Sequence, residues 1–284
     1  MRILVTGAAG QLGLDMKDEL LNRNHEVIGL THSDLDIADG QAVMERICEI
    51  APDAVIHCAA WTAVDAAETE AARCMEANST GTENIAKACG YFDCKLVYPS
   101  TDYVFGNNAP CPKRPSDTPD PLNIYGLSKY LGELAVAKYC PKAYIVRTSW
   151  VFGARGKNFI KTILKRSQTN DRLSVVCDQI GRPTYTRDLC RLLADMAERE
   201  KYGVYHACNT GRSVSWYDLA VETLRLSGAK SVIIEPVTAA EFASAAPRPS
   251  DSRLDTRKLS RQGFTQLPHW QDALERYLTE LRGQ

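Results

Sequence analysis

The amino-acid sequence predicts an α/β fold built on a doubly wound parallel sheet, and two observations support this prediction. Short, almost wholly apolar runs alternate with amphipathic stretches through the first half of the chain, as repeated strand–helix–strand units require. Three glycines, Gly7, Gly10 and Gly13, follow the first apolar run and open the first amphipathic stretch. This combination is typical of a Rossmann-type sheet, and the looser pattern after residue 150 predicts a smaller, interleaved C-terminal lobe.

The apolar runs and amphipathic stretches locate the expected elements. Strands are expected at residues 3–5, 26–30, 54–58, 96–98, 144–148, 173–177 and 204–207. Runs this short, with nearly every position apolar, are typical of parallel strands that helices cover on both faces. Helices are expected at residues 11–22, 41–50, 71–90, 123–139, 186–199, 216–227 and 270–281. A segment rich in Ala, Pro and Ser, residues 239–252, is expected to form a loop.

These elements suggest two functional parts. Residues 1–150 are expected to form a dinucleotide-binding domain, whose sheet continues through parts of residues 170–215. Residues 151–284 are expected to form mainly a substrate-binding lobe. A chain of 284 residues has room for one sizeable α/β domain with such a lobe.

Composition excludes several classes of protein. The formal net charge of −1 provides no basic field for nucleic acid, and no apolar run approaches the roughly 20 residues that span a bilayer. The ten cysteines are scattered and form no Cys-x-x-Cys pair or metal-ligand cluster, which indicates small buried side chains in a reducing compartment. Met1-Arg2 leads straight into a strand rather than a signal peptide, so we expect a cytoplasmic protein. From the charge, the apolar runs and the cysteine spacing we expect no nucleic-acid partner, no membrane partner and no metal.

The glycine-rich segment offers a phosphate-binding loop. Gly7, Gly10 and Gly13 permit a tight turn and close backbone approach to a pyrophosphate, and the N-terminus of the following helix supplies N–H donors. Their spacing departs from the usual Gly-x-Gly-x-x-Gly fingerprint, so a glycine turn without a ligand is the alternative. The strand–turn–helix context favours the cofactor.

The end of the second expected strand does not decide which nicotinamide cofactor binds. A carboxylate about 20 residues after the loop binds the ribose 2′-hydroxyl of NAD, whereas an arginine accommodates the extra phosphate of NADP. Here Thr31-His32 ends the strand, Asp34 and Asp36 come a few residues late, and no Arg or Lys stands there. NADPH and NADH both stay open.

Two further strand ends carry residues suited to a site, since open α/β sheets bind ligands at the carboxyl ends of their strands. Ala60, Trp61 and Thr62 follow the third expected strand, where a small residue lets a nicotinamide ribose lie close to the backbone. Plain packing at a strand end is the alternative. Thr101 and Asp102 follow the fourth expected strand, where a hydroxyl either bonds to a substrate oxygen or merely satisfies a turn.

Tyr125 and Lys129 stand four residues apart, on one face of an expected helix. An ordinary tyrosine has a pKa near ~10, and a neighbouring ammonium lowers that pKa toward useful acid/base work. The alternative is a core tyrosine beside a solvated lysine.

Two later residues have weaker assignments. Trp150 comes just past the fifth expected strand, where its indole either stacks on a base or sugar or belongs to the core. Arg248, in the Pro247-Arg248-Pro249 segment, either clamps a diphosphate or lies exposed in its loop.

Together the glycine loop, the Thr-Asp pair and the Tyr-x-x-x-Lys motif resemble the extended short-chain dehydrogenase/reductase superfamily. Within it, the chain is similar over nearly its whole length to the dTDP-4-dehydrorhamnose reductase family. The main segments that carry this resemblance are Gly10-Gln11-Leu12-Gly13, Leu35-Asp36-Ile37, Ala59-Ala60-Trp61-Thr62, Ser100-Thr101-Asp102-Tyr103-Val104-Phe105, Asn123-Ile124-Tyr125-Gly126, Arg147-Thr148-Ser149-Trp150 and Asp178-Gln179-Ile180-Gly181-Arg182-Pro183-Thr184. Sugar-nucleotide dehydratases of the superfamily tend to carry Asp-Glu after the threonine, whereas Tyr103 follows Asp102 here.

The resemblance implies reduction of the 4-keto group of dTDP-4-dehydro-L-rhamnose with NADPH or NADH, by a monomer or homodimer. Some members of the family form metal-bridged dimers through acidic residues, but Asp15 is the one residue at a plausible position here, so no metal is expected. Tyr125 would donate the proton, Lys129 would lower the pKa of the phenol and hold the ribose, and Thr101 would bond to the reacting oxygen. Expected cofactor contacts are Gly7, Gly10, Gln11, Leu12, Gly13, Thr31, Asp36, Ile37, Ala60, Trp61, Thr62, Tyr125 and Lys129. Expected contacts to the dTDP-sugar are Thr101, Asp102, Trp150 and Arg248.

Two rival readings stay open at this point. Another nucleotide-sugar 4-reductase, an epimerase or a dehydratase shares the same fold and cofactor, and an epimerase keeps that cofactor tightly bound. A non-catalytic regulatory subunit that binds a nicotinamide cofactor is the other rival. Such a subunit has no need of an intact Thr/Tyr/Lys set, which this chain keeps.

Overall fold

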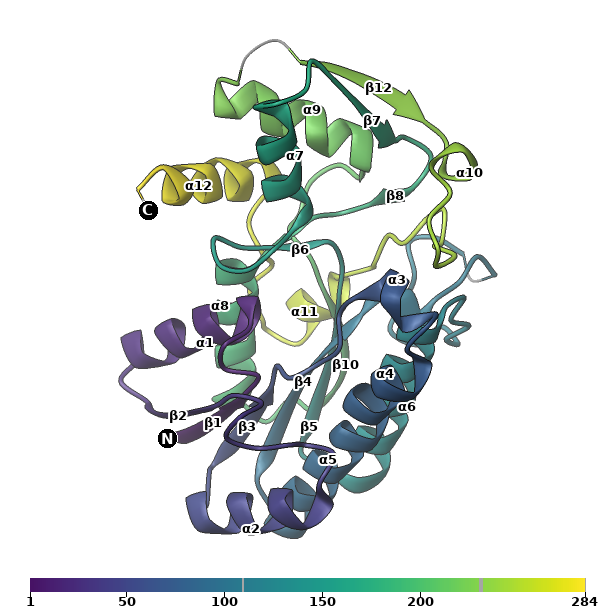
Figure 1. Cartoon of the computed structure of the whole chain (residues 1–284). Helices are drawn as coiled ribbons and strands as arrows, with labels where there is room; N and C mark the ends of the chain where they lie inside the picture. Colours follow the sequence, from purple (N-terminus) through teal and green to yellow (C-terminus); the bar gives the residue numbers. More distant parts are fainter. Residues whose placement is uncertain (109, 230–231, 284) are drawn as a thin grey trace.

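The computed structural model describes residues 1–108, 110–229 and 232–283. Within these ranges six parallel strands form the central sheet, in the spatial order β10-β5-β4-β3-β1-β2 (Figure 1). In chain order these strands are β1 (Arg2–Thr6), β2 (Glu26–Leu30), β3 (Ala54–His57), β4 (Lys95–Thr101), β5 (Ala143–Thr148) and β10 (Gly203–Ala207). The doubly wound parallel sheet that the sequence predicts is confirmed.

The order of the strands creates a crevice at one edge of this sheet. β1 lies between β2 and β3, so successive crossovers leave β1 in opposite directions and open a space at the carboxyl ends of the strands. Thr6 pairs in register with His57, and Thr101 pairs with Thr148. The last residues of β1, β3, β4 and β5 therefore meet along the same edge, where the loops that follow them gather.

Helices cover both faces of the sheet (Figure 1). One face carries α2 (Gly40–Ile50), α5 (Gly81–Tyr91) and α6 (Ile124–Tyr139), and the other carries α1 (Gln11–Asn22) and α8 (Thr186–Ala197). Successive side chains of β1 point to opposite faces of the sheet. Ile3 and Val5 pack in the core beneath α1 and α8, and Leu4 packs in the core beneath α2 and α5. Each such burial is worth about 1.5–3 kcal/mol, which explains why the strands are apolar at nearly every position.

The elements after β5 build a smaller lobe, at the top of the molecule in Figure 1. Its strands form three pairs: β6 (Val151–Phe152) with β9 (Thr184–Tyr185), β7 (Arg172–Val176) with β12 (Ile233–Val237), and β8 (Ile180–Gly181) with β11 (Val214–Ser215). Its helices are α7 (Phe159–Ser167), α9 (Trp216–Ser227), α10 (Ala239–Phe242) and α12 (Trp270–Arg282). Because α8 and β10 return to the central sheet, and α11 (Arg257–Arg261) packs near β10, the two parts interleave.

Several elements differ from those expected. β4 extends to Thr101, so this hydroxyl ends the strand instead of following it. The helix expected at residues 71–90 is divided into α4 (Ala71–Met75), a π-helical turn (Glu76–Thr80) and α5. The helices α3 (Val64–Ala67), α7, α10 and α11 and the strands β6, β8, β9, β11 and β12 were not expected, because most are too short to produce a hydrophobic period. Of these, α10 lies at the start of the segment, residues 239–252, that was expected to be a loop throughout. The division of the chain near residue 150 stays a prediction.

The π-helical turn holds the loop that follows β3 through hydrogen bonds from Asn78. Asn78, inside it, accepts the N–H of Trp61 at 2.8 Å and donates its own amide to the Trp61 carbonyl at 3.0 Å. The turn therefore fixes the loop that follows β3, at the carboxyl edge of the sheet. No helix within the described ranges combines the length and the apolar character needed to cross a membrane.

Candidate active site

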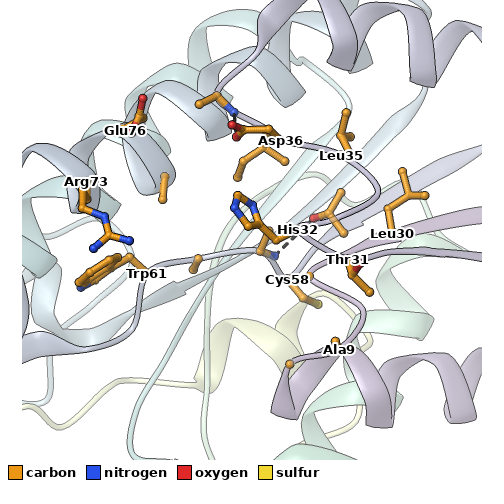
Figure 2. A pocket seen from close by; sticks show the side chains of 18 residues that line it. Ala9, Leu30, Thr31, His32, Leu35, Asp36, Cys58, Trp61, Arg73 and Glu76 are labelled. Carbon is orange, nitrogen blue, oxygen red and sulfur yellow. Dashed lines mark hydrogen bonds between the residues drawn. The ribbon is translucent and has the colours of Figure 1, made fainter.

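Two adjoining cavities lie along the carboxyl edge of the central sheet. The first, of about 570 Å³, extends from the glycine loop to the turn after β2 (Figure 2). The second, of about 440 Å³, lies over the ends of β4 and β5, and the two share Gly10, Cys58 and Ala60. Every cofactor or substrate residue expected from the sequence lines one of these cavities, with the exception of Arg248.

The glycine loop forms one wall of both cavities. Gly7 has a φ of 64°, in the left-handed region, and a Cβ atom there would stand 2.6 Å from the Ala59 nitrogen. The loop therefore packs directly against the chain after β3. α1 begins at Gln11 with Gly10 as its N-cap and no side-chain cap, so the N–H groups of its first turn are available to an anion. This wall fits the diphosphate of a dinucleotide.

The turn after β2 closes the far end of the first cavity. The Asp34 carboxylate accepts the N–H of Thr31 at 2.8 Å and its hydroxyl at 2.6 Å, and these bonds lower the pKa of Asp34. Asp36 accepts the N–H of Ala38 at 3.0 Å and lines the cavity together with Ile37. Asp34 is therefore engaged within the turn, and Asp36 is the acidic side chain that this turn contributes to the cavity wall.

The opposite wall carries Trp61, which the sequence predicts, and two residues that sequence reasoning missed, Arg73 and Glu76. Figure 2 shows Trp61, Arg73 and Glu76 across the cavity from Leu30 and Thr31. The Arg73 guanidinium lies 5.2 Å from the centroid of the Trp61 ring, a cation–π contact. Arg73 and Glu76 belong to a helical stretch of ordinary polar spacing, so nothing in their own segment marks them as cavity residues.

The first turn of α6 places Tyr125 beside the end of β4. Asn123 caps the helix: its side-chain oxygen accepts the N–H of Gly126 at 2.7 Å, and its amide donates to the Pro247 carbonyl at 2.8 Å. A Cβ atom on Gly126 would stand 2.1 Å from the Tyr103 carbonyl oxygen. The helix and the turn after β4 therefore touch backbone to backbone, and this contact requires glycine.

Tyr125, Thr101 and Asp102 form one connected group. The Thr101 hydroxyl donates to Asp102 Oδ1 at 3.1 Å and accepts the N–H of Tyr103 at 3.1 Å, and it lies close enough to Tyr125 to influence the pKa of the phenol. All three side chains line the second cavity. The structure thus brings together the hydroxyl and the phenol that the sequence predicts as partners.

The pKa of Tyr125 differs from the expectation. Burial raises the pKa of Tyr125, the nearby Thr101 hydroxyl opposes that rise, and the net direction is upward. We expected the ammonium of Lys129 to lower the pKa of the phenol, but in this closely packed site the cost of burying a phenolate is larger. The phenol therefore keeps its proton at neutral pH, which is the state that a proton donor requires.

Lys129 lies one helical turn beyond Tyr125 and is 3% exposed. Its ammonium donates to the Pro99 carbonyl at 2.9 Å and lies 4.0 Å from the centroid of the Tyr98 ring. Burial lowers the pKa of Lys129 to about 7, and the nearby Glu133 carboxylate acts in the opposite direction. The charge of Lys129 is therefore sensitive to pH near neutrality.

A buried ion pair that sequence reasoning missed lies behind Lys129. Glu133 and Arg147 have side chains that are each 4% exposed, and Nη2 of Arg147 lies 2.6 Å from Oε2 of Glu133. Ser100, next to Thr101, donates its hydroxyl to Glu133 Oε1 at 2.6 Å. The pair thus joins β4, β5 and α6 beneath the second cavity.

Two stacked indoles form an aromatic wall of the second cavity. Trp150, with a φ of 50°, stacks on Trp216 with ring centroids 3.6 Å apart and planes inclined by 10°. Both indoles line the second cavity and a neighbouring apolar cavity of about 370 Å³, to which Phe159 and Leu219 also contribute. Such a wall is suited to stacking against a planar base. Trp216 was missed because nothing in its own segment relates it to Trp150.

Arg248 lies outside both cavities. Its guanidinium donates to Asp65 Oδ2 at 2.7 Å and to the Ala246 carbonyl at 3.1 Å. Asp65 also accepts the N–H of Ala246 at 3.0 Å. The expected diphosphate contact of Arg248 stays a prediction.

A parallel sheet with a glycine loop at its crevice and a Thr/Tyr/Lys set beside it defines an NAD(P)-dependent oxidoreductase of the short-chain dehydrogenase/reductase type. The chain belongs to the RmlD substrate binding domain family, whose model matches residues 1–282.

Individual relatives agree with this membership. A dTDP-4-dehydrorhamnose reductase of Streptomyces griseus is 41% identical over 288 residues, 99% of this chain and 94% of that protein. A crystal structure of dTDP-4-dehydrorhamnose reductase from Bacillus anthracis in complex with NADP is 40% identical, with a TM-score of 0.95 over 98% of this chain and 99% of that one. A dTDP-4-keto-6-deoxy-D-glucose reductase of Streptomyces niveus is 36% identical over 274 residues, 96% of this chain and 95% of that protein. The family resemblance carried by the motifs is confirmed.

Proposed function

We propose that this protein reduces the 4-keto group of dTDP-4-dehydro-L-rhamnose to give dTDP-L-rhamnose, the last step of dTDP-rhamnose biosynthesis, with NADPH or NADH as reductant. The observation that carries the proposal is the meeting of Thr101, Tyr125 and Lys129 in one cavity. That cavity adjoins another of about 570 Å³, a volume usual for cofactor sites. The 41% identity to the Streptomyces griseus enzyme supports the choice of sugar nucleotide.

The chain contributes acid catalysis and charge stabilisation. A nicotinamide cofactor, when bound, supplies the hydride for C4 of the sugar. Tyr125 donates its proton to the keto oxygen as negative charge develops there, and its raised pKa keeps that proton available at neutral pH. Thr101 hydrogen-bonds to the same oxygen, and Lys129 would hold the ribose hydroxyls of the cofactor and stabilise the phenolate once it forms.

The residues that would hold the two ligands follow the walls of the cavities. The N-terminus of α1 and its loop would bind the diphosphate, the turn after β2 the adenosine, and the loop after β3 the nicotinamide ribose. The diphosphate residues would be Gly7, Gly10, Gln11, Leu12 and Gly13. The adenosine residues would be Thr31, Asp36 and Ile37, and the residues at the nicotinamide ribose would be Ala60, Trp61 and Thr62. Asp102 and Trp150 would contact the dTDP-sugar, with Arg248 as a further contact to its diphosphate.

We also propose a cytoplasmic protein that acts as a monomer or homodimer and has no nucleic-acid or membrane partner. The near-zero net charge supports the absence of a nucleic-acid partner. Residues 1–150 would mainly bind the cofactor, and residues 151–284 would mainly bind the sugar nucleotide. Size-exclusion chromatography with light scattering would measure the number of chains.

The test is the loss of NADPH or NADH absorbance when dTDP-4-dehydro-L-rhamnose is added, with dTDP-L-rhamnose identified as the product. Tyr125→Phe removes the proton donor and keeps the ring, so we expect kcat to fall by about 10²–10⁴-fold while NADPH still binds. Near-normal turnover of this variant would contradict the acid role. No turnover by the unchanged protein would contradict the proposed function, and a stoichiometric protein partner would then favour a regulatory subunit.

A second candidate is reduction of a different dTDP-4-keto sugar. The observation that favours it is the 36% identity to the Streptomyces niveus dTDP-4-keto-6-deoxy-D-glucose reductase. The same assay with both keto sugars separates the two, since the true substrate should show the higher kcat/KM. A cofactor that stays bound through purification, with no net oxidation, would instead indicate an epimerase.

A further inference from the structure

The loop between β6 and α7, residues 153–158, belongs to the smaller lobe but contacts the start of α1 in the larger part. Asn158 donates its side-chain amide to Gln11 Oε1 at 3.0 Å. A Cβ atom on Gly156 would stand 3.1 Å from the Cβ atom of Gln11. Lys157 therefore lies between two residues that contact Gln11, the residue with which α1 begins.

Polar contacts hold this loop in place at both of its ends. Nη2 of Arg155 lies 2.6 Å from Oδ2 of Asp18 on α1. Asn158 also caps α7, because its side-chain oxygen accepts the N–H of Lys161 at 3.0 Å. The loop is thus attached to α1 and to α7 at once, and these contacts fix the backbone on either side of Lys157.

Lys157 carries a free cation to the glycine loop. It lines the second cavity together with Gly10, Gln11, Leu12 and Gly13. Its ammonium has no hydrogen-bond or ion-pair partner within the part of the chain that the structure describes. Since the first turn of α1 has no side-chain cap, its N–H groups and this ammonium border the same cavity with no other partner for either.

The charge of a dinucleotide requires such a cation. Its diphosphate is dianionic, whereas a helix N-terminus supplies only about half a positive charge. Among the described residues that line the two cavities, the other lysine and arginine side chains are Lys129 and Arg73. Lys129 donates to the Pro99 carbonyl at 2.9 Å, and Arg73 pairs with Glu70 at 2.5 Å. Lys157 is therefore the cation that these cavities leave without a partner.

We propose that Lys157 binds the diphosphate of the nicotinamide cofactor, so that the smaller lobe supplies a cation to the dinucleotide site of the larger part. The inference rests on the proposed function, because that function requires the cofactor. A lysine ammonium is a compact point charge on a flexible stem, which suits a phosphate oxygen. Sequence reasoning missed Lys157 because it is distant along the chain from the glycine loop.

The test measures binding rather than turnover. The Kd of NADPH is obtained from the fluorescence of the bound dihydronicotinamide, in wild type and in Lys157→Met. Methionine keeps an unbranched side chain and removes the charge, so we expect the Kd to rise by about tenfold. Lys157→Arg restores the charge and should keep the Kd within about threefold of wild type.

Lys165→Met is the matched control. Lys165 is exposed on the same helix, α7, and lines neither cavity. Its loss changes the net charge equally and should leave the Kd of NADPH within about twofold of wild type. Because salt screens an exposed charge, the difference between wild type and Lys157→Met should shrink when the salt concentration rises from about 0.05 M to about 0.5 M.

Two further ligands identify the group that Lys157 binds. ADP-ribose has the diphosphate but neither the nicotinamide nor the 2′-phosphate of NADPH, so its Kd should rise by the same factor in Lys157→Met. dTDP carries the diphosphate of the sugar nucleotide, and its Kd should stay within about twofold of wild type. Isothermal titration calorimetry measures both.

An unchanged Kd of NADPH in Lys157→Met would overturn the proposal, and so would an equal rise in Lys165→Met. A rise for dTDP, or for NADPH without ADP-ribose, would assign Lys157 to another phosphate and would overturn it as well. The proposed function fails in a different way, because wild type would then bind NADPH without oxidising it when the keto sugar is added. The comparison of Kd values would still decide the role of Lys157.

Discussion

Replacing Glu133 with glutamine should break the ion pair beneath the second cavity while it preserves the size of the side chain. Glu133 binds Arg147 through Nη2 at 2.6 Å and Nε at 2.9 Å, and it accepts the Ser100 hydroxyl at 2.6 Å. Both side chains of the pair are 4% exposed. Glu133→Gln therefore leaves the Arg147 guanidinium buried without a compensating charge.

The expected magnitude follows from that burial. Removal of one partner from a buried ion pair costs about 3–5 kcal/mol, and each kcal/mol lowers the Tm of a domain this large by about 2–4 °C. We therefore expect the Tm of Glu133→Gln to fall by roughly 6–20 °C. Because Glu133 also raises the pKa of Lys129, Lys129 should lose its proton at a lower pH in the variant. The KM for NADPH should then begin to rise at a lower pH than in wild type.

The assay is thermal unfolding followed by circular dichroism, together with KM for NADPH between pH 6 and 9. A matched control is Glu235→Gln, because Glu235 pairs with Arg172 at 2.5 Å on the surface, where the side chains are 66% and 42% exposed. Surface pairs contribute at most about 1 kcal/mol, so the control should lose little stability. Equal losses in Glu133→Gln and Glu235→Gln would refute the reasoning, and so would an unchanged pH dependence of KM.

Two further predictions concern the placement of the site. In Gly126→Ala the new Cβ atom would meet the Tyr103 carbonyl oxygen at 2.1 Å, so α6 must shift. This shift displaces Tyr125, and kcat should fall by about 10²-fold. Circular dichroism should show an intact fold, and a kcat within threefold of wild type would contradict the prediction. Trp216→Ala removes the indole stacked 3.6 Å from Trp150, and we expect the KM of the dTDP-sugar to rise by about tenfold with little change in the KM of NADPH. An equal rise in both KM values would argue against a wall that serves the sugar nucleotide.

Much of the fold was predictable because its determinants are local. Residues 3–5 and 26–30 are apolar at nearly every position, and strands covered on both faces need no other signal. The strands β6, β8, β9 and β11 have two residues each, too few for any hydrophobic period to show. Their positions depend on partners that are distant in the sequence.

The candidate site was predictable for a related reason. In a parallel sheet the residues after successive strands meet at one edge, so chain order alone brings Gly10, Thr101 and Tyr125 to neighbouring cavities. Arg73 and Trp216 reach the same cavities from segments whose spacing is that of ordinary helices. No local pattern distinguishes them from residues on a solvated or core face.

By itself, the sequence determined the doubly wound sheet, the glycine loop and the identity of the Thr101, Tyr125 and Lys129 side chains on which the proposed chemistry rests. Only the tertiary structure decided the protonation of these groups. Burial raises the pKa of Tyr125 and of Asp102 and lowers that of Lys129. The physical reason is that desolvation depends on all the atoms packed around a group, and those atoms come from strands, helices and loops scattered along the whole chain.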